Sequence, residues 1–177
     1  MRKLIGVLAI SVVAVAMVPA TALATHSNGQ GPSKDFVTGT LKLALPTPLG
    51  TFPGQIHNNG SSESASGPGV PATGHFYTDI FDTPFGTVNL SGDIVCLTAI
   101  GNNAWLRSVI TSSNTGLAPP GFGLLSRIVD NGEGADDPPD SAVGFLTPPP
   151  GPNPTCPTVP FTTNPSNYGN TTVHDGV

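Results

Sequence analysis

Charged residues are scarce in this sequence: they form 10% of its 177 residues, against about 25% in typical soluble domains. Lys and Arg number only six, and the four that follow the N-terminal segment, Lys34, Lys42, Arg107 and Arg127, are scattered along the chain. Binding to a nucleic-acid backbone requires clustered cations that displace counterions. We therefore expect no nucleic-acid partner. Long helices are also disfavoured, because few Glu, Lys and Arg are present to cover their exposed faces.

Motifs for nucleophilic catalysis and for transition-metal binding are missing as well. The chain has no G-x-S-x-G sequence, and its four histidines are far apart in the chain. We therefore predict no catalytic residue from motifs. A pair of carboxylates for glycoside hydrolysis stays possible in principle, since its members come from separate strands. The candidates are Asp79, Asp82 and Asp93, although exposed turn acids are far commoner.

The sequence contains one long hydrophobic run, from Leu4 to Val18. Arg2 and Lys3 precede it, and Ala22-Leu23-Ala24 follows as a small-x-small cleavage site, which is typical of a secretory signal peptide. The run is shorter than the ~20 residues of a membrane-spanning helix. We predict cleavage after Ala24, secretion, and no membrane association afterwards. The mature chain keeps four cations against eleven acids and is acidic.

Gly and Pro, in contrast, are abundant, with 22 and 20 copies. They favour turns and extended segments over helices. Alternating apolar residues and β-branched runs predict strands about ten residues apart. We expect an all-β fold, a single antiparallel β-sandwich or small barrel with long Pro/Gly-rich loops. The predicted strands are 36–44, 74–81, 86–91, 94–100, 104–112, 124–129 and 142–147.

The predicted organisation has four parts: a signal peptide (1–24), a flexible leader (25–35), a β-domain (36–147) and a Pro-rich tail (148–177). The low-complexity stretch 58–71 is expected to be a long exposed loop. Ten prolines between Pro138 and Pro165 favour an extended wrap over the surface. The last residues, 164–177, are expected to be loosely held.

Asp93 to Thr111 is predicted to form the central hairpin of the domain, with a turn at Gly101-Asn102-Asn103. Both of its faces are apolar, which indicates a strand pair covered on two sides. Cys96 lies in this hairpin and Cys156 in the tail, and they are the only cysteines. In a secreted chain they are expected to form a disulfide. Two free buried thiols are the alternative.

The segment from Asp130 to Asp140 is rich in oxygen ligands. Gly132 and Gly134 occupy positions where an EF-hand requires side-chain oxygens, so that motif does not fit. A solvated acidic turn and a weak Ca²⁺ site are both open, and no other cofactor is indicated. The candidate Ca²⁺ ligands are Asp130, Asn131, Glu133, Asp136, Asp137 and Asp140.

Aromatic side chains are few, and they include one Trp. Trp105, Phe122, Tyr77 and Tyr168 are candidates for a platform that stacks on sugar rings. Trp105 lies inside the predicted hairpin, where core packing is the commoner role. Phe122, between two glycines after Pro119 and Pro120, is the candidate binding aromatic.

The segments GHFYTDIF, GDIVCLTAIGNNAWLRSVIT and GFGLLSRIVDNGEGADDPPD together resemble the uncharacterised secreted β-domains of bacterial surface and exported proteins. The resemblance covers Gly74 to Asp140. It is carried by Cys96-Leu97 in a strand, by Gly101-Asn102 in a turn, and by the acidic turn Asp130-Asn131-Gly132. The resemblance implies export and an all-β module, with no assigned activity. The Pro-rich tail, and Trp105 with Arg107, depart from the family's pattern.

These observations favour an exported, non-catalytic β-domain with a structural or binding role at the cell envelope or in the medium. Cell-wall or extracellular polymers are the candidate partners. A small extracellular polysaccharide hydrolase is one alternative, and it would require two carboxylates about 5 to 9 Å apart in a cleft. A ligand-binding β-barrel is the other, and it would require an apolar cavity of at least ~300 Å³.

Overall fold

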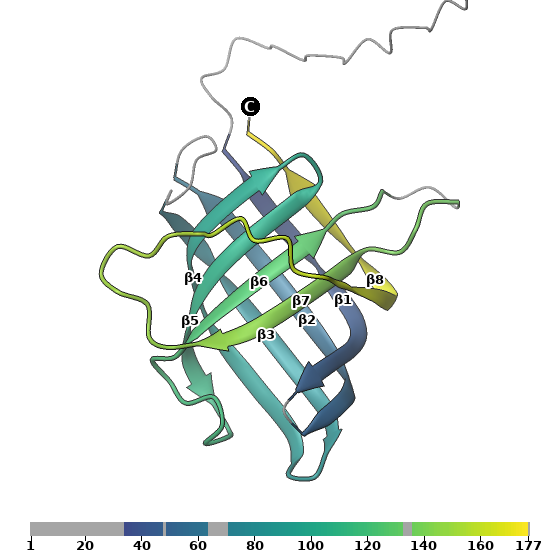
Figure 1. Cartoon of the computed structure of the whole chain (residues 1–177), viewed down its shortest axis with the longest axis vertical. Helices are drawn as coiled ribbons and strands as arrows, with labels where there is room; N and C mark the ends of the chain where they lie inside the picture. The colour runs from purple at the N-terminus through teal and green to yellow at the C-terminus, as the bar shows by residue number, and fades with distance from the viewer. Residues whose placement is uncertain (1–33, 48, 64–70, 133–135, 177) are drawn as a thin grey trace, which may run out of the picture. The chain divides into compact units, whose positions relative to one another are not determined.

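The computed structural model describes residues 34–47, 49–63, 71–132 and 136–176. The expected signal peptide and nearly all of the expected leader lie outside these residues. All regular secondary structure of the described residues is β-strand, and neighbouring strands pair in antiparallel fashion (Figure 1). The strands are β1 (Phe36–Thr47), β2 (Gly50–Ser62), β3 (Ala72–Thr83), β4 (Gly86–Ile100), β5 (Asn103–Ser113), β6 (Gly123–Val129), β7 (Ser141–Thr147) and β8 (Asn164–His174).

Each strand pairs with the next one along the chain, and β8 pairs with β1, so that the eight strands close into a barrel. The all-β prediction is therefore confirmed. Closure gives each strand two partners and removes the exposed edges of an open sheet. An eight-stranded barrel has an interior just wide enough to be filled by side chains or to hold one small ligand.

Alternation along the strands places apolar side chains inside. In β5, for example, Ala104, Leu106 and Ile110 are buried in the interior, while Trp105 points to the outer surface. The end of the barrel near Val37 and Ile128 is filled by one continuous apolar cluster. The interior is therefore a packed core at this end.

β2 extends through Ser62, so the predicted loop 58–71 is wrong for residues 58–62; residues 64–70 lie outside the described part of the chain. Every second residue from Gly54 to Ser62 is buried. Small residues are needed there because a Cβ on Gly60 would lie 2.7 Å from Cδ1 of Ile94. The interior is crowded at this strand, which is why it lacks the bulky β-branched residues by which strands are usually recognised.

Residues 148–163, here called the proline strap, cross the outer surface of the barrel in an extended conformation (Figure 1). Cys156 in the strap and Cys96 in β4 form a disulfide with a Cα–Cα distance of 5.7 Å, which confirms the predicted pairing. Trp105 Nε1 donates to the carbonyl of Val159 at 2.8 Å. The β4–β5 hairpin is thus covered by the interior on one face and by the strap on the other.

The prediction of a loosely held C-terminal segment is wrong for residues 164–174, which form β8. This strand pairs with β1 from Phe36↔His174 to Leu43↔Ser166. Its pairing with β7 is short, from Ser141↔Pro165 to Ala142↔Asn164. β8 is poor in bulky apolar residues, and it is held by backbone hydrogen bonds more than by side-chain burial.

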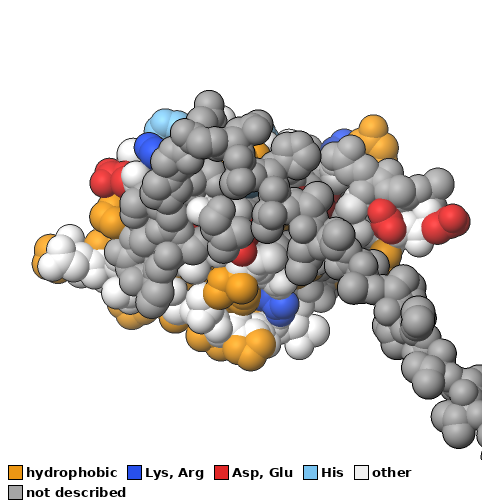
Figure 2. Space-filling model, turned by 90° about the horizontal axis from the view of Figure 1, so that it is seen from above, with side chains coloured by type: hydrophobic (Ala, Val, Ile, Leu, Met, Phe, Trp, Pro, Cys, Tyr) orange, Lys and Arg blue, Asp and Glu red, His pale blue; other side chains and the backbone are white. Residues whose placement is uncertain are grey.

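The end of the molecule that carries the C-terminal residues is seen in Figure 2. Among the described side chains visible there, Lys and Arg atoms lie apart from one another. In the part of the chain that the structure describes, no helix is long and apolar enough to cross a membrane.

Candidate functional site

An apolar cavity of about 470 Å³ lies in the half of the barrel away from the C-terminus. This is within the range of ligand sites in proteins, and it exceeds the ~300 Å³ expected of a ligand-binding barrel. Its walls come from six of the eight strands and from the turns at that end. The lining residues from the strands are Leu45, Pro46, Thr47, Ile56, Thr78, Ile80, Thr83, Val88, Leu90, Leu124, Ser126, Gly144, Phe145 and Leu146.

The mouth of the cavity is formed by three chain connections. In an up-and-down barrel alternate connections lie at the same end, so the β1–β2, β3–β4 and β5–β6 connections meet there. Each contributes one apolar lining residue with a large exposed fraction: Leu49 (47%), Phe85 (69%) and Leu117 (58%). Exposed apolar side chains gathered around an opening often mark a binding site.

One part of the cavity wall has incomplete strand pairing. The pairing of β1 with β8 ends at Leu43, and the pairing of β7 with β8 ends at Ala142. The segments that continue beyond these points, 44–47 of β1 and 143–147 of β7, both contribute lining residues. The cavity therefore extends to the part of the barrel wall in which β1 and β7 run past the end of their pairing with β8.

The β5–β6 connection packs over this end of the barrel and is firmly anchored. Ala118 in it is buried against Phe76 and Ile110. The side chain of Asn114 accepts a hydrogen bond from the Asn89 amide at 2.8 Å and donates one to the Thr87 carbonyl at 2.9 Å. The cavity is thus formed by a fixed framework before any ligand binds.

The polar groups of the lining are neutral. None of the described lining residues is Asp, Glu, His, Lys or Arg, and the hydroxyl groups come from Thr47, Thr78, Thr83, Thr115 and Ser126. Thr78 Oγ1 is buried and has no hydrogen-bond partner among the described residues. The cavity can therefore enclose an apolar molecule and offer it a few hydroxyl contacts, but it has no acid or base.

The three carboxylates considered for hydrolysis do not line this cavity. Asp79 accepts a hydrogen bond from the side chain of Asn89. A hydrogen bond with Asp79 is also the main cause that raises the pKa of Tyr77 above its usual value. Asp93 lies 2.8 Å from Nδ1 of His75, and both side chains are largely exposed. Asp82 is in the left-handed region, with φ of 56°, next to the β3–β4 turn. The structure does not gather them at the cavity.

The acidic segment has a structural role that sequence reasoning did not foresee. Asp140 is 3% exposed, and its carboxylate accepts hydrogen bonds from the amides of Asn131 at 2.8 Å and Thr171 at 2.7 Å. Asp130 accepts from the amides of Gly132 at 3.0 Å and Val173 at 3.0 Å. Both carboxylates therefore connect the acidic segment to β8, beyond the point where β7 stops pairing with it.

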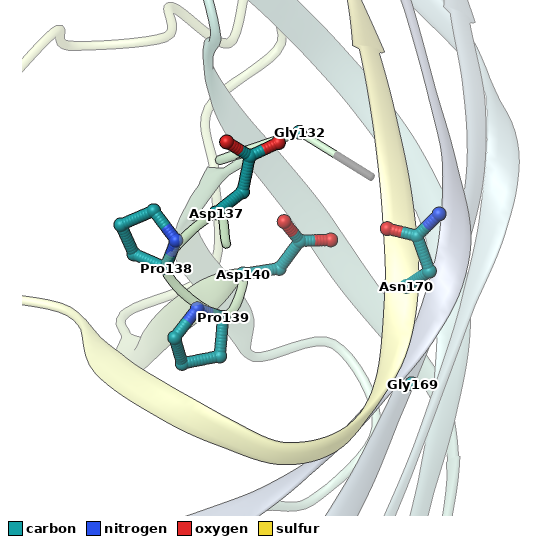
Figure 3. A pocket seen from close by; sticks show the side chains of 7 residues that line it. All are labelled: Gly132, Asp137, Pro138, Pro139, Asp140, Gly169 and Asn170. Carbon is teal, nitrogen blue, oxygen red and sulfur yellow. The ribbon is translucent and has the colours of Figure 1, made fainter. Parts of the chain in front are cut away.

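Figure 3 shows the shallow pocket between this segment and β8, with the Asp140 carboxylate pointing toward β8 and Asn170 across from it. Asp136 and Asp137 are exposed, and Glu133 lies outside the described residues. Among the residues that are described, no group of three or more His, Cys, Asp or Glu is arranged to hold a metal ion. The weak Ca²⁺ site stays a prediction.

The candidate aromatics are spread over the surface. Trp105 is 8% exposed beneath the strap, where the guanidinium of Arg127 lies 5.6 Å from its ring centre, so its role is packing. Phe122 is exposed in the β5–β6 connection, and Tyr168 lies on β8 under Lys42. Phe122 is therefore not part of a platform with Trp105, and a role of its own in binding stays a prediction.

Sequence reasoning missed the residues that line the cavity. The alternation of Phe76, Thr78 and Ile80 in one predicted strand could have placed Thr78 on the interior face. No protein-family model matches the chain, and no curated protein or solved structure matches it either. We therefore infer the function from the residues that line the cavity.

Proposed function

We propose that this chain is an exported binding protein that holds one small, mostly apolar molecule in the cavity of its barrel. The observation that carries the proposal is the cavity of about 470 Å³ lined almost wholly by apolar side chains. Protein interiors are normally packed to the density of organic crystals. A large apolar space kept open in a 177-residue chain is therefore best explained by an occupant.

Transfer of an apolar molecule from water into this space is favourable by about 25 cal/mol for each Å² of its surface that is buried. Outside the part where β1 and β7 run past their pairing with β8, the walls need little rearrangement, because Asn114 and the strand ladder already hold them in place. Preorganisation lowers the cost of ordering that binding would otherwise incur. The cavity is thus suited to a ligand of low solubility in water.

Export is supported by the signal-like N-terminus and by the Cys96–Cys156 disulfide, since disulfides persist in oxidising compartments. A role in binding is favoured over hydrolysis because the described lining residues include no carboxylate. Polymer binding through Phe122 is less favoured, because among the described residues the paired aromatic rings are Phe36–His174 and Phe145–Phe161, and neither pair includes Phe122. An apolar small molecule is therefore the partner we favour.

The proposal is tested by titrating the mature protein with the apolar fluorophore N-phenyl-1-naphthylamine. We expect saturable binding at one site. Gly144 lines the cavity, and a Cβ there would lie 3.4 Å from Ser126 Oγ and 3.5 Å from Cδ1 of Leu124. Gly144→Val therefore places methyl groups in or beside the space. It should weaken the fluorophore's affinity about tenfold or more, because overpacking typically costs about 1–3 kcal/mol and about 1.4 kcal/mol corresponds to a factor of ten in affinity.

Gly151→Val is the matched control, because a Cβ at the exposed Gly151 of the strap meets no atom within 4 Å. This variant should bind the fluorophore like the wild type. Near-ultraviolet circular dichroism should show that both variants are folded. Absence of saturable binding to the wild type, or equal affinity in the wild type and Gly144→Val, would refute a binding role for the cavity.

A further inference from the structure

The cavity wall contains a hydroxyl group whose hydrogen-bonding capacity is not used by the protein. Thr78 is 6% exposed and lies on the interior face of β3. Its Oγ1 is buried and has no partner among the described residues. Buried side-chain polar atoms are in large majority hydrogen-bonded. A group that breaks this rule inside a cavity indicates that its partner is supplied from outside the chain.

The Thr78 hydroxyl can reach such a partner by a small movement. Thr78 belongs to the cavity wall, and rotation about its Cα–Cβ bond exchanges the positions of its hydroxyl and methyl groups. Strand residues adopt more than one staggered χ1 position. Ser126, on β6, places a second hydroxyl in the same wall. After this rotation, Thr78 and Ser126 each place a neutral hydroxyl, able to donate and to accept, in the wall of the cavity, and the other hydroxyl groups of the lining, those of Thr47, Thr83 and Thr115, are also uncharged.

The absence of charge in the wall restricts the ligand further. An ionised carboxylate or ammonium group moved from water into apolar surroundings needs a partner of opposite charge. None of the described lining residues carries one. A fatty-acid anion or an amine would have to leave its charged group outside, in the solvent at the mouth. A ligand that fits wholly inside must be neutral.

We propose that the natural ligand is a neutral, largely hydrocarbon molecule with one hydroxyl or carbonyl group that forms a hydrogen bond with Thr78. Alcohols, ketones and phenols of compact hydrocarbon skeleton belong to this class. This inference rests on the proposed binding function and names the class of molecule that the same cavity takes. The apolar residues around the mouth, Leu49, Phe85 and Leu117, would contact the hydrocarbon part as it enters.

The test compares three probes that share one skeleton: naphthalene, 2-naphthol and 2-naphthoate. Binding is measured from the fluorescence of each probe with the mature wild-type protein, Thr78→Val and Thr73→Val. Thr73 is an exposed residue of the same strand and does not line the cavity, so Thr73→Val is the matched control. Valine has nearly the shape of threonine, so it removes the hydroxyl and leaves the wall in place.

We expect the wild type and Thr73→Val to bind 2-naphthol about three- to tenfold more tightly than naphthalene, the gain of one net hydrogen bond. Binding of 2-naphthoate should be weaker than that of either neutral probe. In Thr78→Val the preference for 2-naphthol should disappear, while naphthalene still binds. Retained naphthalene binding also shows that the variant is folded.

Two results would overturn the inference and leave the binding function standing. One is equal affinity of the wild type for naphthalene and 2-naphthol. The other is a preference for 2-naphthol that survives in Thr78→Val. Tighter binding of 2-naphthoate than of 2-naphthol would refute the requirement for a neutral ligand. Failure of all three probes and of N-phenyl-1-naphthylamine to bind the wild type would refute the binding function itself.

Discussion

Substitution of Asp140 tests whether carboxylates complete the closure of the barrel. Asp140 is nearly fully buried, and its two oxygens accept one amide hydrogen bond each, from Asn131 and from Thr171 in β8. A hydrogen bond to a charged group contributes about 1.5–3 kcal/mol. Asp140→Asn keeps one acceptor and turns an NH₂ group toward the other amide. We therefore expect the free energy of unfolding to fall by about 1.5–3 kcal/mol.

The measurement is urea denaturation followed by the fluorescence of Trp105, the only Trp in the chain. Trp105 is buried under the strap, so its emission should report loss of the folded barrel. Asp136→Asn is the matched control, because Asp136 is an exposed residue of the same segment. It should change the free energy of unfolding by less than about 0.5 kcal/mol.

Amide hydrogen exchange locates the effect. In Asp140→Asn the Thr171 amide should exchange faster, because its carboxylate acceptor is weakened or lost. Exchange at Leu106, in the packed half of the barrel, should change only with global stability. Unchanged stability together with unchanged exchange at Thr171 would refute the idea that Asp140 holds β8 in the barrel.

Three further predictions concern the cavity and the strap. Thr78→Val should raise the free energy of unfolding of the ligand-free protein by about 1 kcal/mol or more, because it removes a buried hydroxyl without a partner; an equal or lower urea midpoint would contradict this. Gly144→Ala should raise it by about 0.4–1 kcal/mol, because glycine loses more chain entropy on folding and the added Cβ makes ordinary contacts; a loss of more than about 1 kcal/mol would show that the wall cannot accept it. Reduction of the Cys96–Cys156 disulfide, which spans 60 residues, should lower the free energy of unfolding by about 4 kcal/mol on the chain-entropy estimate; equal denaturation curves with and without reductant would contradict it.

The strands that could be predicted are those whose bulky residues face a packed interior or the strap. Segments 94–100, 104–112, 124–129 and 142–147 were predicted from such residues, and they fall in β4 to β7. Their apolar alternation arises from local geometry, since successive side chains point to opposite faces. The disulfide was also predictable, because a chain with two cysteines that is predicted to be secreted has one pairing available.

Neither β2 nor β8 is among the predicted strands, because both are held by features that do not depend on bulky side chains. In β2, small residues are required where Ile94 fills the interior. In β8, amides of Thr171 and Val173 bond to the carboxylates of Asp140 and Asp130, which lie more than 30 residues earlier in the chain. The predicted break between strands 86–91 and 94–100 is wrong, because Gly92 continues the strand. It lies within β4, and a Cβ there would lie 1.9 Å from the carbonyl oxygen of Val109.

The candidate site was the least predictable part. A cavity is defined by what the facing strands leave unfilled, and no single segment determines it. The alternation in β3 indicates that Thr78 points inward, but its lack of a partner depends on residues from the other strands. The acidic segment could be predicted as a candidate Ca²⁺ site because its ligand-type residues are close together in sequence. Two of its carboxylates serve the closure of the barrel instead.

The most direct test of the central claim is a methyl NMR titration of the mature protein with 2-naphthol. We expect chemical-shift changes at the methyl groups of Ile80, Val88, Leu90 and Leu124, which line the cavity. The methyl groups of Leu97, in the packed half of the barrel, should change little. Shift changes confined to outer-surface residues, or no changes at saturating probe, would contradict the claim that the barrel holds an apolar ligand.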